Sequence, residues 1–214
     1  MEKLRIVERL IKFLDGEFGN AKCALNQKNI YELTIATILS AQCTDEMVNR
    51  VTPKLFEKYP DFPHLAKADI EDIKEIIKPT GFFNNKAKSI SNLAKKITED
   101  FQGKLPLKID QMIKLPGIGR KTANVILGEY GTPEGIVVDT HVLRIAQRLG
   151  LSDSDNPEKI EKDLTHLITK DRWGKISHQI IQFGRQICTA RKPKCHICPF
   201  PDICKFYIDN NKKI

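Results

Sequence analysis

LPGIGRKTANVIL, residues 115–127, places two glycines two positions apart, directly before the start of a regular helical pattern. Gly117 and Gly119 allow a tight turn with positive φ, and neither has a Cβ that would keep a ligand away from the backbone. Apolar residues recur at helical spacing on both sides of the turn. The stretch therefore predicts a helix over 108–115, a turn, and a second helix over 120–130.

The turn leads into the amino end of the second helix, where unpaired N–H groups and the positive end of the helix dipole suit a phosphate. We expect the apolar residues Leu115 and Ile118 to anchor the turn against both helices. Most Gly-x-Gly turns are merely turns, but a turn of this kind between two helices in a basic protein is stronger evidence for a bound phosphate.

Lys121 lies in the first turn of the second helix, on the side opposite its apolar stripe. Its neighbours at helical spacing are Asn124, Val125 and Gly128, whereas a freely solvated face would more often have charged residues. A lysine inside a cleft loses hydration, which favours its neutral and nucleophilic form. Most lysines are nevertheless solvated surface residues, and the helix pattern alone favours that interpretation.

GIVVDTH, residues 135–141, has an aspartate between an apolar run and the start of a helix. Asp139 is therefore predicted at or next to a helix N-cap, where backbone N–H groups hold a carboxylate in place. A plain cap is enough to explain this residue. A catalytic role would require Asp139 and Lys121 to face each other across a cleft, which their spacing does not determine.

The remainder of the chain is also helical in pattern. Residues 29–41 (NIYELTIATILSA) are apolar almost all round, which is typical of a central buried helix. Asp69 and the pair Asn156–Pro157 have the residue types of helix N-termini. Residues 136–138 are the one short apolar run with strand character, and they are too isolated to build a sheet. The predicted fold class is all-α.

The composition is that of an ordinary globular protein, with 214 residues, 41% of them hydrophobic and 29% charged. A formal net charge of +8 favours a polyanionic partner, nucleic acid above all. No apolar run reaches the roughly 20 residues that a membrane span requires. The amphipathic start is unlike a secretory signal, so we expect a cytoplasmic protein with reduced thiols.

Four of the six cysteines lie in the segment 188–204: Cys188, Cys195, Cys198 and Cys204. Thiolates that converge from so short a segment repel one another unless a metal centre offsets their charge. Zinc sites usually contain two tight Cys-x2-Cys pairs, whereas this segment has one such pair with wider flanking gaps. The spacing favours a [4Fe–4S] cluster and leaves zinc as the alternative.

In combination, these motifs resemble the endonuclease III family of DNA glycosylases with lyase activity. The resemblance rests on LSAQCTD at 39–45, LPGIGRKTAN at 115–124, VDTH at 138–141 and the cysteine spacing, and it covers nearly the whole chain. It implies an enzyme of base excision repair that removes oxidised pyrimidines from duplex DNA through a lysine Schiff base. The enzyme would also cleave 3′ to the abasic site by β-elimination, and it would act as a monomer.

The resemblance also implies two all-α lobes. A six-helix barrel would span 23–133 and contain a helix-hairpin-helix motif at about 108–130. A cluster domain would be built from both ends of the chain, residues 1–22 and 134–214.

Site residues follow from the same resemblance. Lys121 stands at the family's catalytic lysine and Asp139 at its catalytic aspartate, on opposite lobes that flank a cleft. Gln42 matches the glutamine that fills the space left by a flipped base, and Phe82, or Phe83 beside it, matches the side chain that wedges into the duplex. Further DNA contacts are implied for Leu115, Gly117, Gly119, Arg191 and Lys192. Residues Cys188, Cys195, Cys198 and Cys204 would bind the [4Fe–4S] cluster.

Three other classes of protein share part of this pattern. An adenine-mismatch glycosylase shares the cluster and the aspartate, but that group lacks lysine at position 121 and has an extra C-terminal domain, whereas this chain stops soon after Cys204. A non-catalytic helix-hairpin-helix module would bind duplex DNA without forming a covalent adduct. A small iron–sulfur electron carrier would need neither the hairpin nor the lysine.

Overall fold

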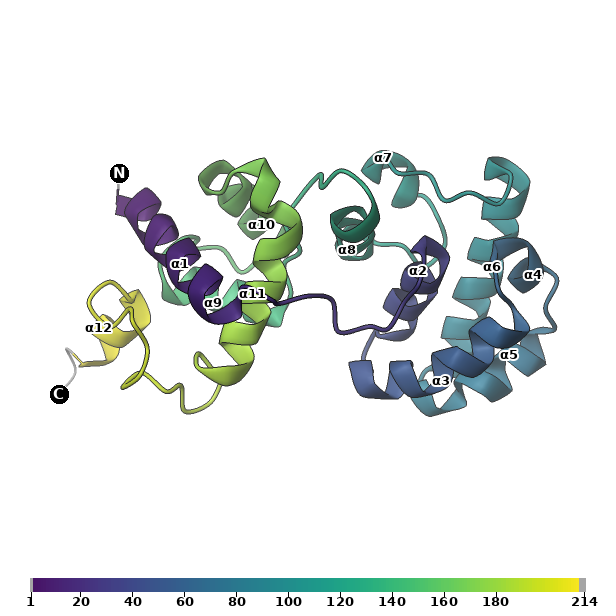
Figure 1. Ribbon diagram of the computed structural model, residues 1–214, viewed down its shortest axis with the longest axis horizontal. Coiled ribbons are helices and arrows are strands. Elements are labelled where there is room, and N and C mark those ends of the chain that lie inside the picture. The colour runs from purple at the N-terminus through teal and green to yellow at the C-terminus, as the bar shows by residue number, and fades with distance from the viewer. Residues whose placement is uncertain (1, 212–214) are drawn as a thin grey trace. The chain divides into compact units, whose positions relative to one another are not determined.

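The structure is a computed structural model that describes residues 2–211 (Figure 1). Within this range all regular secondary structure is helical, which confirms the predicted all-α class. Residues 136–138 form no strand. None of the helices described is long and apolar enough to cross a membrane. The chain divides into two compact units, of which one is Cys23–Thr132 and the other combines the segments on either side of it.

The unit Cys23–Thr132 has a core of buried aliphatic side chains from most of its helices. Its helices are α2 (Ile30–Leu39), α3 (Asp45–Lys58), α4 (Phe62–Ala66), α5 (Ile70–Ile77), the short 3-10 helix η1 (Lys78–Thr80), α6 (Phe83–Phe101), α7 (Ile109–Met112) and α8 (Arg120–Tyr130).

Helix α2 is the central helix of this unit, as its sequence predicts. It begins at an N-cap in which the side chain of Asn29 accepts a hydrogen bond from the backbone N–H of Glu32. Most of its side chains are buried, because α2 packs against α3, α6 and α8. An all-round apolar helix of this kind gains stability from burial on every face rather than on a single stripe.

The second unit is formed by helices from both ends of the chain. It contains α1 (Glu2–Phe18), α9 (Thr140–Arg148), α10 (Pro157–Leu167), the 3-10 helix η2 (Lys170–Arg172), α11 (Trp173–Gln186) and α12 (Lys205–Asn211). Phe183 of α11 and Phe200 of the cysteine segment are fully buried, and both pack edge-to-face against Phe13 of α1. The core of this unit therefore anchors the cysteine segment.

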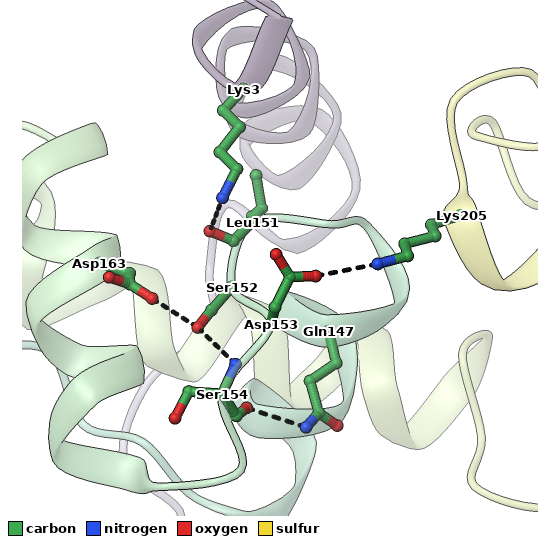
Figure 2. Close-up of polar contacts among 8 residues, drawn as sticks. All are labelled: Lys3, Gln147, Leu151, Ser152, Asp153, Ser154, Asp163 and Lys205. Atoms are coloured by element: carbon green, nitrogen blue, oxygen red, sulfur yellow. Dashed lines mark hydrogen bonds and ion pairs between the residues drawn. The ribbon is translucent and has the colours of Figure 1, made fainter.

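The loop that follows α9 joins three helices of this unit through polar contacts (Figure 2). The ammonium of Lys3 on α1 donates to the carbonyl oxygen of Leu151 at 3.1 Å, and the hydroxyl of Ser152 donates to Asp163 of α10 at 2.5 Å. Lys205, the first residue of α12, forms an ion pair of 2.9 Å with Asp153. The chain directly after the last cysteine is thereby fixed to the same loop as the N-terminal helix.

Candidate functional site

The predicted hairpin is present, with a shorter first helix than expected. Helix α7 ends at Met112, and the chain then continues with i→i−3 hydrogen bonds up to Leu115. Pro116 follows, and the residue before a proline avoids helical backbone angles, so the regular helix does not extend to Leu115. Leu115 and Ile118 are only 4% and 3% exposed, which confirms that they anchor the turn. Leu115 is therefore in the core, where its N–H donates to the carbonyl oxygen of Met112 and its own carbonyl oxygen accepts from Ile118, so a DNA contact at this residue stays a prediction.

The structural reason for glycine differs between the two glycine positions of the hairpin. Gly117 has φ of +77°, and a Cβ added there would lie 3.2 Å from Cβ of Ser89 and 3.4 Å from Cδ1 of Ile38. Gly119 has φ of −89°, which any residue adopts, and a Cβ at this position would meet no atom of the described residues within 4 Å. The prediction of positive φ is correct for Gly117 and wrong for Gly119. The protein's own packing explains the first glycine but not the second.

Lys121 occupies the first turn of α8 and is exposed. The N-cap of this helix is Gly119, which makes no side-chain cap, and the first turn has no acidic residue. Asn124, predicted on the same face as Lys121, is only 2% exposed, and its Oδ1 has no hydrogen-bond partner within residues 2–211. The lysine amine is thus accessible to a ligand at the amino end of a helix, whereas the residue one turn later is in the interior.

Asp139 is the N-cap of α9, which confirms the predicted cap. Its Oδ1 accepts hydrogen bonds from the backbone N–H groups of His141 at 2.8 Å and Val142 at 2.9 Å. Among the described residues no group donates to its Oδ2, and the side chain is only half-buried. One carboxylate oxygen therefore fixes the orientation of the side chain and the other is available for chemistry. Lys121 belongs to the unit Cys23–Thr132 and Asp139 to the other unit.

Three of the predicted DNA contacts have an unusual backbone conformation. Gln42, Phe82 and Lys192 have φ of +52°, +47° and +50°, and all three are exposed. A non-glycine residue held in this left-handed region costs about 1–3 kcal/mol, and such strain is concentrated at functional sites.

Phe82 is 62% exposed, whereas Phe83 packs against the core. Of these two phenylalanines, only Phe82 presents a large apolar surface to a ligand.

The four cysteines of the segment 188–204 are free and partly buried. Burial, together with the negative charges of Cys188, Cys204 and Cys195, raises the pKa of the Cys198 thiol to about 11. Burial likewise raises the pKa of Cys204. Thiols that disfavour ionisation in each other's presence fit a cationic metal centre, which would offset their charges. Among the residues described, no three His, Cys, Asp or Glu side chains are grouped so as to hold a single metal ion.

Two arginines of α9 hold the start of this segment. Arg148 donates to Sγ of Cys188 at 3.3 Å and to the carbonyl oxygen of Thr189 at 2.8 Å. Arg144 donates to the carbonyl oxygen of Cys188 at 3.1 Å. Sequence reasoning missed both residues. The sequence shows two arginines four positions apart on one predicted helix. It does not show what they bind, because their partners lie about 40 positions further along the chain.

Arg191 and Lys192 lie exposed in the loop between the first two cysteines. The hydroxyl of Thr189 lies 3.1 Å from both of their carbonyl oxygens and can donate to either. This contact directs the backbone oxygens toward Thr189, and the two cationic side chains remain in solvent. The loop is therefore suited to contact an anionic surface.

Comparison with known proteins gives consistent matches. Residues 35–170 match the HhH-GPD superfamily of base excision DNA repair proteins, and residues 188–204 match the iron–sulfur binding domain of endonuclease III. The second match decides between the two metal centres that the spacing left open, in favour of the [4Fe–4S] cluster.

Individual relatives agree with these matches over the full length. The chain is 47% identical to an endonuclease III of Synechocystis over 95% of this chain and 93% of that protein. It superimposes on a non-covalent endonuclease III–DNA complex with a TM-score of 0.91 and 37% identity, covering 98% of each chain. A trapped endonuclease III–DNA covalent intermediate gives the same TM-score and identity, covering 97% of this chain and 98% of the other.

Proposed function

The chain belongs to the endonuclease III family, within the HhH-GPD superfamily of base excision DNA repair proteins, and from this membership we propose the roles of its individual residues and its substrate. The protein is a bifunctional DNA glycosylase and AP lyase with a [4Fe–4S] cluster. The proposed substrate is duplex DNA that contains an oxidised pyrimidine or an abasic site. The enzyme would act as a monomer in the cytoplasm, at the nucleoid, where this DNA is located.

Lys121 is the proposed nucleophile. Its exposed amine lies at the uncapped amino end of α8, where an anionic DNA strand is attracted to the helix dipole. The amine forms a bond to C1′ of the damaged nucleotide, the C1′–N bond breaks, and the base leaves with the bonding electrons. Loss of a proton from nitrogen and opening of the sugar ring give a Schiff base. Removal of a C2′ proton then breaks the C3′–O bond, which cuts the strand 3′ to the lesion.

Asp139 is the proposed electrostatic partner of this reaction. Positive charge develops on the sugar while the glycosidic bond breaks, and a fixed carboxylate stabilises that charge. The cap hydrogen bonds from His141 and Val142 hold Oδ1, so the side chain is already oriented before substrate binds. Its Oδ2 remains available to the sugar and to proton transfer.

We propose that the hairpin binds a DNA phosphate through its backbone. The observation that supports this role is Gly119, which has neither a positive φ nor any internal contact that would exclude a side chain. An approaching phosphate gives a reason for the missing Cβ.

Arg191 and Lys192 would add contacts to the DNA backbone. Gln42 and Phe82 would enter the duplex at the lesion, where a damaged base stacks poorly and is less costly to extrude.

The two glycines offer a matched pair of substitutions. We expect Gly117→Ala to destabilise the fold by about 1–2 kcal/mol, because alanine is strained at positive φ. Gly119→Ala would cost at most about 1 kcal/mol, the difference between glycine and alanine at an N-cap. It would nevertheless weaken DNA binding by about tenfold, the equivalent of one charge-assisted hydrogen bond. Urea unfolding and fluorescence anisotropy with labelled duplex measure the two effects. Unchanged affinity in Gly119→Ala would contradict a phosphate site at the hairpin.

Covalent trapping tests the proposed substrate and chemistry together. The protein is incubated with a duplex that contains one oxidised pyrimidine, and borohydride is added to reduce any Schiff base to a stable amine. We expect a covalent protein–DNA adduct, and we expect none with the same duplex lacking the lesion. A protein that forms no adduct with either the oxidised pyrimidine or a preformed abasic site would overturn the proposal.

A further inference from the structure

Lys86 is a buried lysine that the proposed chemistry does not use. It lies in the first turn of α6 and is only 5% exposed. Its ammonium donates to the carbonyl oxygen of Thr80 at 2.7 Å, and no carboxylate pairs with it among residues 2–211. An ammonium removed from water with a single hydrogen bond from Nζ is costly, so the fold itself gives no reason to prefer lysine here.

The carbonyl group that Lys86 binds lies directly before an unusual turn. Gly81 has φ of +69° and ψ of 161°, a combination that is essentially restricted to glycine, and Phe82 follows with left-handed angles of 47° and 27°. Two consecutive residues with positive φ place the exposed ring of Phe82 at the start of α6. No side chain caps this end of the helix.

Lys86 holds this turn from both sides. Its backbone N–H donates to the carbonyl oxygen of Phe82 at 3.0 Å, while its Nζ binds the carbonyl oxygen of Thr80. The two carbonyl groups therefore flank Gly81 and are both bound by a single residue. The hydroxyl of Thr80, which is itself buried, donates to the carbonyl oxygen of Ile77, so the preceding residues are fixed as well.

We propose that Lys86 is a positioning residue, which holds the Gly81–Phe82 turn in the strained shape that presents Phe82 to the DNA duplex. This inference rests on the proposed role of Phe82. Burial lowers the pKa of Lys86, as expected for an ammonium removed from water. The lysine therefore stabilises the conformation of a turn that contacts DNA, and its burial lowers the stability of the fold.

Lys86→Met tests this inference, with Lys88→Met as the matched control on the exposed face of the same helix. Methionine keeps the length of the side chain and removes the bond to Thr80. We expect Lys86→Met to fold with an unchanged or higher melting temperature, because a buried ammonium is replaced by an apolar group. Its single-turnover rate of base removal would fall by about ten- to a hundredfold, since misplaced groups have effects of this size. The fluorescence of 2-aminopurine next to the lesion, which reports unstacking, would rise less than with the unmutated protein.

A double-mutant cycle separates positioning from a general structural effect. In a Phe82→Ala background, Lys86→Met should have no further effect on the rate, because its action depends on Phe82. Lys86→Arg, which retains a cationic donor, should recover part of the rate. Wild-type rates in Lys86→Met, additive losses in the double mutant, or failure of Lys86→Met to fold would each overturn the inference. Failure of the proposed function is distinct, because it would appear as absence of a trapped adduct in the unmutated protein.

Discussion

Lys121→Gln is expected to abolish the borohydride-trapped adduct and to reduce strand cleavage by at least about a thousandfold, as loss of a nucleophile does in other enzymes. The nitrogen lone pair of glutamine is delocalised into its carbonyl group, so it does not attack C1′. Lys121 is exposed, and its replacement therefore leaves packing intact. The measurement is denaturing electrophoresis of a labelled duplex that contains an oxidised pyrimidine.

The matched control for this variant is Lys95→Gln. Lys95 is also exposed on a helix, α6, and its replacement removes the same charge from the same unit. Wild-type trapping in Lys95→Gln would show that the effect of Lys121→Gln is chemical and not a general loss of DNA attraction. An adduct that persists in Lys121→Gln would mean that another amine is the nucleophile.

Asp139→Asn is expected to reduce the rate of base removal by about a hundred- to a thousandfold, the effect of removing one preorganised electrostatic group. Asparagine retains an oxygen that accepts from the N–H groups of His141 and Val142, so the cap of α9 is preserved. The stability of the protein should change by less than about 0.5 kcal/mol, as expected when one good capping residue replaces another. Single-turnover kinetics and urea unfolding measure the two quantities.

Two comparisons make the result for Asp139 specific. Asp139→Ala removes the cap as well as the charge, so it should lose about 1 kcal/mol of stability that Asp139→Asn keeps. A duplex with a preformed abasic site has no glycosidic bond to break, and Asp139→Asn should lose less activity on it than on the oxidised pyrimidine. Equal losses on the two substrates would place Asp139 at a later step and contradict its role in base departure.

Residues close together in the sequence made the correct predictions possible. The hairpin follows from the glycine spacing and the helical periodicity around it, and the cap at Asp139 follows from its place before a helix. The cysteine segment predicted a metal centre from its spacing, and it needed the family match to decide between zinc and iron–sulfur. Each of these features depends on backbone geometry or ligand spacing within a few turns of chain, which the residue types report directly.

Other features of the site depend on residues that are distant in the sequence. The spacing made Gly117 and Gly119 equivalent, but contacts with Ser89 and Ile38 and the backbone angles separate their roles. Nothing local indicated that Lys86 is buried or that Arg148 binds Sγ of Cys188.

The sequence by itself thus determined the helices, the hairpin, the cap and the metal-binding segment. Only the tertiary structure decided that Phe82 and not Phe83 is exposed, and that one oxygen of Asp139 remains available. The physical reason is that helix formation and capping are short-range properties of the chain. Exposure and hydrogen-bond partners depend on which distant segments pack against each residue.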